Sequence, residues 1–298
     1  MNRFNIALVI ILLNVVAITA QEGTSVMYQA VAWSRDGKYL SFTRMEFTNT
    51  QPRKMKADVY VMRADGTGVR KVTGDDSNEF APAWSRDGKM VYFGASVPES
   101  KEGQIYFAKV DGTGLTQLTK DAGRKAEPSV SPDGKWIAYD SAIVERKPQI
   151  YVMRSDGSSP KALTADNSLA YYCPVWSPDG KRIVYYVEKG DNKDQIWVMN
   201  GDGSNQTLLT NNIGHNFYPS WSADGKRIIF TSTRDGGEQG LYSMSADGSD
   251  VARIKDVTSF FARYSPDGKK LAYIVGRFPQ TSIMVADADG TNAKKVSP

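Results

Sequence analysis

The stretch CPVWSPDGKRIVYY, residues 173–186, decides the fold of this 298-residue chain, because variants of it recur along the sequence. In each variant a large residue precedes Ser-x-Asp-Gly-Lys and a short apolar run, and the six large residues are Trp33, Trp84, Val130, Trp176, Trp221 and Tyr264. The turn glycines stand at positions 37, 88, 134, 180, 225 and 268, so successive repeats lie 43 to 51 residues apart. A period of this length with strand-like apolar runs is typical of propeller blades.

Each repeat contains the turns and strands of one small sheet. In the repeat quoted above, residues 177–180 fit a type I turn, with Ser first, Pro second, Asp third and Gly fourth. Strand-like runs follow at residues 181–186, 195–199 and 206–210, and a second Asp-Gly turn precedes the last run. We therefore predict an all-β, six-bladed propeller with four antiparallel strands per blade. The predicted blades span residues 29–73, 79–119, 125–164, 171–210, 216–255 and 259–298.

The first twenty residues do not belong to the predicted propeller. A basic start at Arg3, an apolar run over residues 4–18 and small residues before Gln21 predict a cleaved signal peptide over residues 1–20. A transmembrane anchor is the alternative, but the run is short for a membrane span. We expect the remaining chain, residues 21–298, to be exported to the periplasm or secreted, with no membrane span after cleavage.

Composition excludes several classes of protein. The net charge of +4 is weak and no Lys/Arg run stands out, so nucleic-acid binding is not expected. Cys173 is the only cysteine in the sequence, which excludes an internal disulfide, and we interpret it as a small strand residue rather than a reactive thiol. His215 is the only histidine, and no G-x-S-x-G motif occurs. We therefore predict no catalytic residue, no cofactor and no enzyme activity.

The Trp of the repeat is interpreted as a packing anchor between neighbouring blades. A large aromatic residue next to a tight turn suits burial between blades better than stacking on a ligand. Blade one begins with its innermost strand, and blade six ends with its outermost strand at residues 294–297. We therefore expect the ring to close by packing of blade six against blade one, without a shared strand.

Topology separates the propeller into two faces. The first and third turns of each blade share one face, and both are short Asp-Gly turns, which we expect to be a poor platform for a specific site. The opposite face carries longer, more variable connections rich in aromatic residues, which together with Arg are typical of protein-binding surfaces. The predicted partner-binding residues, on this long-loop face and at the channel mouth, are Tyr28, Glu79, Phe80, Glu127, Tyr171, Tyr172, His215, Tyr218, Arg234, Phe260 and Phe261.

The aromatic residues of this set have an alternative interpretation, in which several rings fill the channel mouth. If they bind a partner, replacing Tyr172, Tyr218 and Phe261 with Ala is expected to abolish its capture and to leave thermal unfolding nearly unchanged. A calcium ion in the channel also stays open, since carboxylates such as Glu79 and Glu127 could converge there.

The repeat resembles that of the TolB propeller family. The strongest stretch is PSWSADGKRIIFTSTRDGG at residues 219–237, and the similarity covers residues 29–298. The resemblance implies a periplasmic six-bladed propeller that binds the peptidoglycan-associated lipoprotein and accepts disordered peptide segments, or a calcium ion, in its channel. TolB has an α/β domain before its propeller, whereas about eight residues separate Gln21 from blade one here. Contacts made through that domain are therefore not carried over.

These observations favour a monomeric, non-enzymatic propeller of the cell envelope that binds a protein or peptide. The resemblance suggests a peptidoglycan-associated lipoprotein as one partner. Two other functions stay open. A glycan-binding module would use aromatic faces with Asn216, Glu127 and Arg234, and an enzyme acting on envelope polysaccharide would depend on His215.

Overall fold

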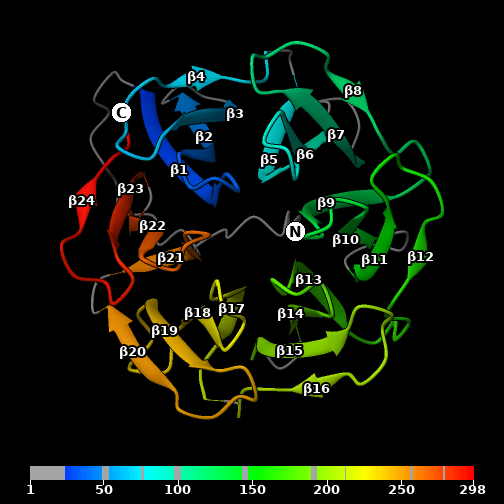
Figure 1. The fold of residues 1–298 in the computed structure, drawn as a ribbon, viewed down its shortest axis with the longest axis vertical. Helices are drawn as coiled ribbons and strands as arrows, with labels where there is room; N and C mark the ends of the chain where they lie inside the picture. The colour runs from blue at the N-terminus through cyan, green and yellow to red at the C-terminus, as the bar shows by residue number, and fades with distance from the viewer. Residues whose placement is uncertain are drawn as a thin grey trace.

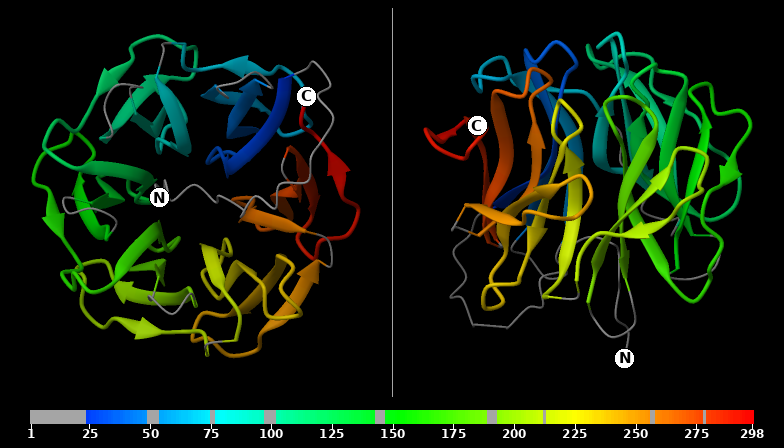
Figure 2. Two further views of the ribbon diagram at one scale, coloured as in Figure 1. Left: turned by 180° about the vertical axis from the view of Figure 1, so that it is seen from behind. Right: turned by 60° about the horizontal axis from the view of Figure 1, so that its bottom comes forward.

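The computed structural model shows the predicted all-β, six-bladed propeller. It describes residues 24–48, 54–74, 77–96, 102–142, 147–188, 193–211, 213–255, 258–277 and 279–298, so the predicted signal peptide lies outside the described residues. These ranges form 24 strands in six antiparallel sheets, each made of four consecutive strands. The sheets stand radially around one axis, seen from its two ends in Figure 1 and in the left view of Figure 2. The described residues include no helix long and apolar enough to cross a membrane.

The two inner strands of each blade carry most of the apolar residues, and the anchor residue ends the innermost strand. The innermost strands are β1 (Thr24–Trp33), β5 (Asn78–Trp84), β9 (Arg124–Val130), β13 (Ala170–Trp176), β17 (Asn216–Trp221) and β21 (Ser259–Tyr264). The second strands are β2 (Tyr39–Thr48), β6 (Met90–Ser96), β10 (Trp136–Ala142), β14 (Arg182–Glu188), β18 (Arg227–Ser232) and β22 (Lys270–Arg277). Blades five and six begin at the predicted residues, whereas blade one begins earlier than predicted.

The outer half of each blade consists of one regular strand and one very short strand. The third strands are β3 (Met55–Arg63), β7 (Gly103–Lys109), β11 (Gln149–Arg154), β15 (Gln195–Asn200), β19 (Gly240–Ser245) and β23 (Gln280–Asp287). The outermost strands are β4 (Arg70–Lys71), β8 (Thr116–Gln117), β12 (Lys161–Ala162), β16 (Thr207–Leu208), β20 (Ala252–Lys255) and β24 (Lys294–Lys295). Short outermost strands limit the edge that each blade offers for pairing with another chain.

An aromatic residue at one register of the second strand forms the centre of every blade. Phe42 stacks on Tyr60 of the third strand with ring centroids 5.8 Å apart, and Phe93 stacks on Tyr106 at 6.4 Å. Burying one such side chain contributes about 1.5–3 kcal/mol. The sequence analysis described this strand only as an apolar run. The six central residues, each at most 1% exposed, are Phe42, Phe93, Tyr139, Tyr185, Phe230 and Tyr273.

Side-chain hydrogen bonds hold the first turn of each blade. In blade four, Ser177 Oγ donates to Asp179 Oδ1 at 2.5 Å and accepts from Arg182 N at 2.9 Å. Lys181 N donates to the same Asp179 oxygen at 3.0 Å. Gly180 has a φ of 71°, in the left-handed region that glycine adopts without strain. The other five first turns contain the same three bonds.

The third turns are held in a related way. Asp202 Oδ1 accepts from Ser204 N at 2.9 Å, and every blade repeats this bond. The hydroxyl and backbone donors around these carboxylates lower their pKa values, because they stabilise the charged form. The twelve turn aspartates with lowered pKa values are Asp36, Asp65, Asp87, Asp111, Asp133, Asp156, Asp179, Asp202, Asp224, Asp247, Asp267 and Asp289.

The anchor tryptophans join neighbouring blades, as predicted. Three of them donate from Nε1 to the carbonyl that precedes the anchor of the previous blade: Trp84 to Ala32 at 3.2 Å, Trp221 to Val175 at 3.1 Å, and Trp33 to Arg263 at 3.0 Å. Trp176 differs, because its Nε1 is buried and has no acceptor within the described part of the chain. Its backbone N–H instead donates to Ser129 Oγ at 3.3 Å.

Blades one and six close the ring without sharing a strand, as predicted. Side chains and backbone also form hydrogen bonds across this seam. Thr281 Oγ1 accepts from Tyr28 N at 2.6 Å and donates to Tyr28 O at 3.1 Å. The Tyr28 hydroxyl donates to the carbonyl of the last residue, Pro298, at 2.9 Å. The seam therefore combines apolar packing with hydrogen bonds between the two ends of the propeller.

Candidate functional site

The innermost strands contain a strained residue at the same position in all six blades. Each lies three residues before the anchor, beside a register shift of its strand, and has a φ of 51° to 54°. A left-handed backbone at a residue other than glycine costs about 1–3 kcal/mol and persists where the surrounding structure requires it. We call these six residues the inner ring: Ala30, Ala81, Glu127, Cys173, Tyr218 and Phe261.

Two further positions of the repeat complete a pocket at one mouth of the channel. The neck residues directly precede the anchors and are Ala32, Ala83, Ser129, Val175, Ser220 and Arg263. The rim residues occupy the variable position of Ser-x-Asp-Gly-Lys and are Arg35, Arg86, Pro132, Pro178, Ala223 and Pro266. With every inner-ring residue except Tyr218, they line a cavity of about 630 Å³.

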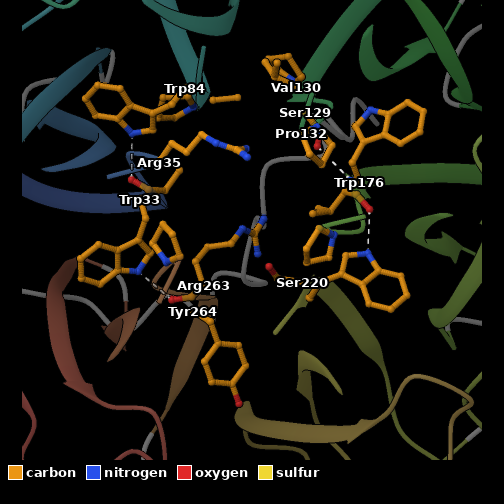
Figure 3. A pocket seen from close by; sticks show the side chains of 18 of the residues that line it. Trp33, Arg35, Trp84, Ser129, Val130, Pro132, Trp176, Ser220, Arg263 and Tyr264 are labelled. Atoms are coloured by element: carbon orange, nitrogen blue, oxygen red, sulfur yellow. Dashed lines mark hydrogen bonds between the residues drawn. The ribbon is translucent and has the colours of Figure 1, made fainter. Parts of the chain in front are cut away.

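One side of this pocket is lined by basic residues and the other side by uncharged residues. Arg263, Arg35 and Arg86 come from three neighbouring blades, six, one and two, and we call them the basic sector. Figure 3 shows Arg35 and Arg263 extending toward the middle of the pocket. The rim residues of blades three to five are uncharged: Pro132, Pro178 and Ala223.

Arg263 is the charged group of the neck. Its Nη1 donates to Ala262 O at 3.0 Å, and no carboxylate among the described residues forms an ion pair with it. Burial lowers the pKa of the guanidinium, because loss of water disfavours the charged form, although Cys173 and Glu127 act in the opposite direction. Glu127 belongs to β9, across the axis from β21, which carries Arg263 (Figure 1).

A buried polar group lies beside Glu127 in the wall of blade three. Arg124 Nη1 pairs with Asp140 Oδ1 at 2.8 Å, while Asp140 Oδ2 and Glu127 Oε2 are buried without a hydrogen-bond donor among the described residues. Burial raises the pKa of Asp140 well above its usual range, and Arg124 opposes that shift. Burial also raises the pKa of the Cys173 thiol, and Glu127 adds to the effect. Cys173 is therefore a poor nucleophile, in keeping with its interpretation as a small strand residue.

The pocket opens on the face that carries the first turns, since its rim residues belong to those turns. This differs from the expectation that the Asp-Gly face is a poor platform. The reason is that Ser, Asp and Gly hold the turn, which leaves the second residue free to vary around the channel. Parts of the connections on the opposite face, including residues 97–101 and 143–146, lie outside the described residues.

Most of the predicted partner-binding residues lie in the interior instead of on a rim. Tyr218 stacks on Phe261 with ring centroids 3.8 Å apart, and Tyr172 stacks on Tyr186 at 5.2 Å. Truncating a buried aromatic residue to Ala costs about 3–5 kcal/mol, so the burial of these rings leads us to expect a loss of thermal stability in the triple variant, in place of nearly unchanged unfolding. The buried members of the predicted set are Tyr28, Glu79, Tyr171, Tyr172, Tyr218, Phe260 and Phe261.

The other predicted residues are partly exposed, and two of them, His215 and Arg234, lie on neighbouring segments of blade five, because His215 N donates to Thr233 Oγ1 at 3.0 Å. Phe80 packs on the small apolar cluster that contains Met27. Arg234 donates to Asn216 Oδ1 at 3.1 Å and lies 5.0 Å from the Tyr242 ring centroid. His215 Nδ1 lies 3.1 Å from Asp194 Oδ2.

Only two members of the predicted set, Glu127 and Phe261, line the pocket. Sequence reasoning missed the basic sector of Arg35, Arg86 and Arg263. The available signal was that these arginines replace the Pro, Ala, Ser or Val found at the same repeat positions in other blades.

The carboxylates named for a calcium ion do not converge. Glu79 is 1% exposed and accepts from the Thr73 hydroxyl at 2.8 Å and from the Ser77 hydroxyl. It does not line the pocket, whereas Glu127 does. Among the described residues, no group of three or more His, Cys, Asp or Glu side chains is placed to hold a metal ion. Glu79 and Glu127 therefore do not fit a shared calcium site.

Solved structures of TolB resemble this propeller. A putative TolB from Agrobacterium tumefaciens is 28% identical, with a TM-score of 0.67 over 77% of this chain and 84% of that chain. TolB from Acinetobacter baumannii is 17% identical, with a TM-score of 0.68 over 90% of this chain and 78% of that chain.

An enzyme structure also resembles this propeller. An oligogalacturonate lyase in complex with manganese is 12% identical, with a TM-score of 0.62 over 92% of this chain and 78% of that chain. The last two likenesses show the fold alone.

Sequence comparison gives a partial relative and a family. Dipeptidyl-peptidase 5 of Porphyromonas gingivalis is 35% identical over 63 residues, which span 21% of this chain and 9% of that protein. The family described as TolB beta propeller domain matches residues 13–192 and 168–298. Because these matches cover all six blades, the chain belongs to the TolB β-propeller family.

Proposed function

We propose that this protein is an exported, non-enzymatic scaffold of the cell envelope that holds a segment of a partner protein in its channel. The pocket at the channel mouth is the observation that carries the proposal. Its volume of about 630 Å³ is within the usual range for ligand sites. Its walls combine apolar Pro, Ala and Val residues with Ser and Arg. Such a mixed lining fits a peptide, which has both polar and apolar groups, better than it fits a purely apolar ligand.

The frame of the pocket supports binding without a large rearrangement. The neck residues are each paired with the second strand of their blade, as Val175 is with Val184, and the rim residues belong to turns held by Ser–Asp hydrogen bonds. A site whose walls are already ordered loses less conformational entropy when it binds a ligand. The proposed ligand is therefore the flexible component, an extended or disordered segment that becomes ordered in the channel.

The proposed location and partner follow from the sequence and the family. A signal peptide over residues 1–20 would direct the protein to the periplasm or outside the cell. The family resemblance makes a peptidoglycan-associated lipoprotein the first partner to test, and we propose that a monomeric propeller binds it.

A pull-down with a blocked channel tests this function. Purified protein is immobilised, exposed to cell-envelope extract and analysed by mass spectrometry. The blocking variant is Ala83→Trp, because Ala83 lies in the neck and a large ring there would fill the pocket. The control is Leu115→Trp, since Leu115 is 43% exposed and does not line the pocket.

The expected result is one dominant envelope protein captured by the wild type and by Leu115→Trp, with capture lost in Ala83→Trp. Equal capture by both variants would place the binding surface outside the channel. Absence of any enriched protein with the wild type would argue against a protein-binding scaffold.

A further inference from the structure

The neck of the pocket contains a cation, Arg263, that forms no ion pair with a carboxylate among the described residues, although the charge of Glu127 favours its charged form. Arg263 is desolvated by the channel, and its only hydrogen bond to a described residue is to the adjacent carbonyl of Ala262. An Arg side chain has five N–H donors, and a buried charge is costly unless it is paired. Figure 3 shows the side chain directed into the cavity. An anion that entered the pocket would therefore find an unsatisfied donor group.

The rim adds positive charge on the same side. Arg35 forms no hydrogen bond or ion pair with another described residue, and Arg86 Nη1 donates to the Asp133 carbonyl at 3.2 Å. Among the described residues neither arginine forms an ion pair with a turn carboxylate, although the charge of Arg86 helps to lower the pKa of Asp133. The basic sector is therefore available to a ligand from outside the chain.

The remaining wall defines where the negative charge would lie. Pro132, Pro178 and Val175 present apolar surface on the opposite side of the mouth. Deeper in the channel, the Oε2 of Glu127 is buried without a donor, so a second carboxylate at that depth would be repelled. The favoured position for a carboxylate is the neck, beside Arg263, with apolar groups of the ligand against the prolines.

We propose that the pocket recognises a carboxylate-bearing peptide segment that enters from the Asp-Gly face, with Arg263 as the pairing group and Arg35 and Arg86 as rim contacts. This inference rests on the proposed function and specifies the chemistry of its ligand. Arg suits the role because its planar fork can bind both oxygens of a carboxylate. The carboxylate could belong to an Asp or Glu side chain or to a C-terminus, and the experiment distinguishes the two.

Three pools of degenerate octapeptides serve as the probe. All are N-acetylated. The first has Glu at a fixed central position and an amidated C-terminus, the second has Gln there and an amidated C-terminus, and the third has Gln there and a free C-terminal carboxylate. Retention of each pool on immobilised protein is measured by mass spectrometry at low and high salt, because exposed charge pairs weaken with salt.

The variants are Arg263→Met and a matched control, Arg63→Met. Arg63 is exposed at the outer part of the same face, so both substitutions remove one positive charge. We expect the wild type to retain one of the two acidic pools about 10-fold or more over the neutral pool. Arg263→Met should lose that excess, and Arg63→Met should keep it. The melting temperature of Arg263→Met should not fall, since the substitution removes a half-buried charge that has no ion-pair partner among the described residues.

Each contrary result is informative. Equal retention of all pools, or no retention of any pool, would overturn carboxylate recognition. An acidic excess that persists in Arg263→Met would move the carboxylate site elsewhere and overturn the role of Arg263. If envelope capture is lost in Ala83→Trp but unchanged in Arg263→Met, the scaffold function stands and only the inferred ligand chemistry fails.

Discussion

Replacing single anchor tryptophans with Phe should show how much the inter-blade hydrogen bond stabilises the propeller. Trp84→Phe removes the bond from Nε1 to the Ala32 carbonyl, which measures 3.2 Å. Trp176→Phe removes no such bond, because the Nε1 of Trp176 is buried without an acceptor among the described residues. Both residues occupy the same repeat position and are partly buried, so the loss of ring volume is similar.

The expected difference between these variants has two parts. Trp84→Phe leaves a partly buried carbonyl without its donor, which costs about 1–2 kcal/mol. Trp176→Phe eliminates a buried donor that has no partner, which offsets part of the lost packing. We therefore expect the free energy of unfolding to fall by about 1–3 kcal/mol more in Trp84→Phe than in Trp176→Phe. At 2–4 °C per kcal/mol, the melting temperatures should differ by roughly 2–12 °C.

Urea unfolding followed by circular dichroism is the appropriate assay, with m-values compared to confirm that all variants unfold to similar states. Trp221→Phe provides an independent check, because its bond to the Val175 carbonyl at 3.1 Å should place it with Trp84→Phe. Equal destabilisation by Trp84→Phe and Trp176→Phe would refute the reasoning. It would mean that ring volume, and not the hydrogen bond, accounts for the role of the anchor.

Three further predictions follow from the turns and the seam. Thr281→Val should lower the free energy of unfolding by about 1–3 kcal/mol, because it removes both seam bonds to Tyr28, and Thr281→Ser should lose less in the same urea assay. Gly248→Ala should destabilise the propeller more than Gly236→Ala does. Both glycines have a positive φ, but only at Gly248 would an added Cβ meet a backbone oxygen, that of Leu209 at 2.6 Å. Equal melting temperatures for the two variants would contradict this prediction. The pKa values of the turn aspartates are lowered by folding, so their stabilisation is complete above about pH 3.9 and is lost as pH falls through the folded values. The melting temperature should therefore fall as the pH drops below about 4, and an unchanged melting temperature at pH 3 would count against these bonds.

The sequence by itself determined the architecture, because the repeat is a local pattern. Ser, Asp and Gly build each first turn from hydrogen bonds between residues at most five positions apart, such as those of Ser177 with Asp179 and Arg182. Six copies of such a turn, each followed by an apolar strand, sufficed to predict six blades of four strands. The inter-blade role of the tryptophans was also predictable, since a large aromatic residue needs burial.

The pocket was decided only by the tertiary structure. Arg35 and Arg263 are more than 220 positions apart in the sequence, and they share a pocket only because blades one and six meet at the seam. The aromatic residues Tyr218 and Phe261 looked like a binding surface in the sequence, yet the left-handed inner ring places their rings against each other. The residues shared by the six repeats build the turns and strands, whereas the pocket is lined by positions that differ between repeats. Closure of the ring decides which of these variable residues lie next to one another.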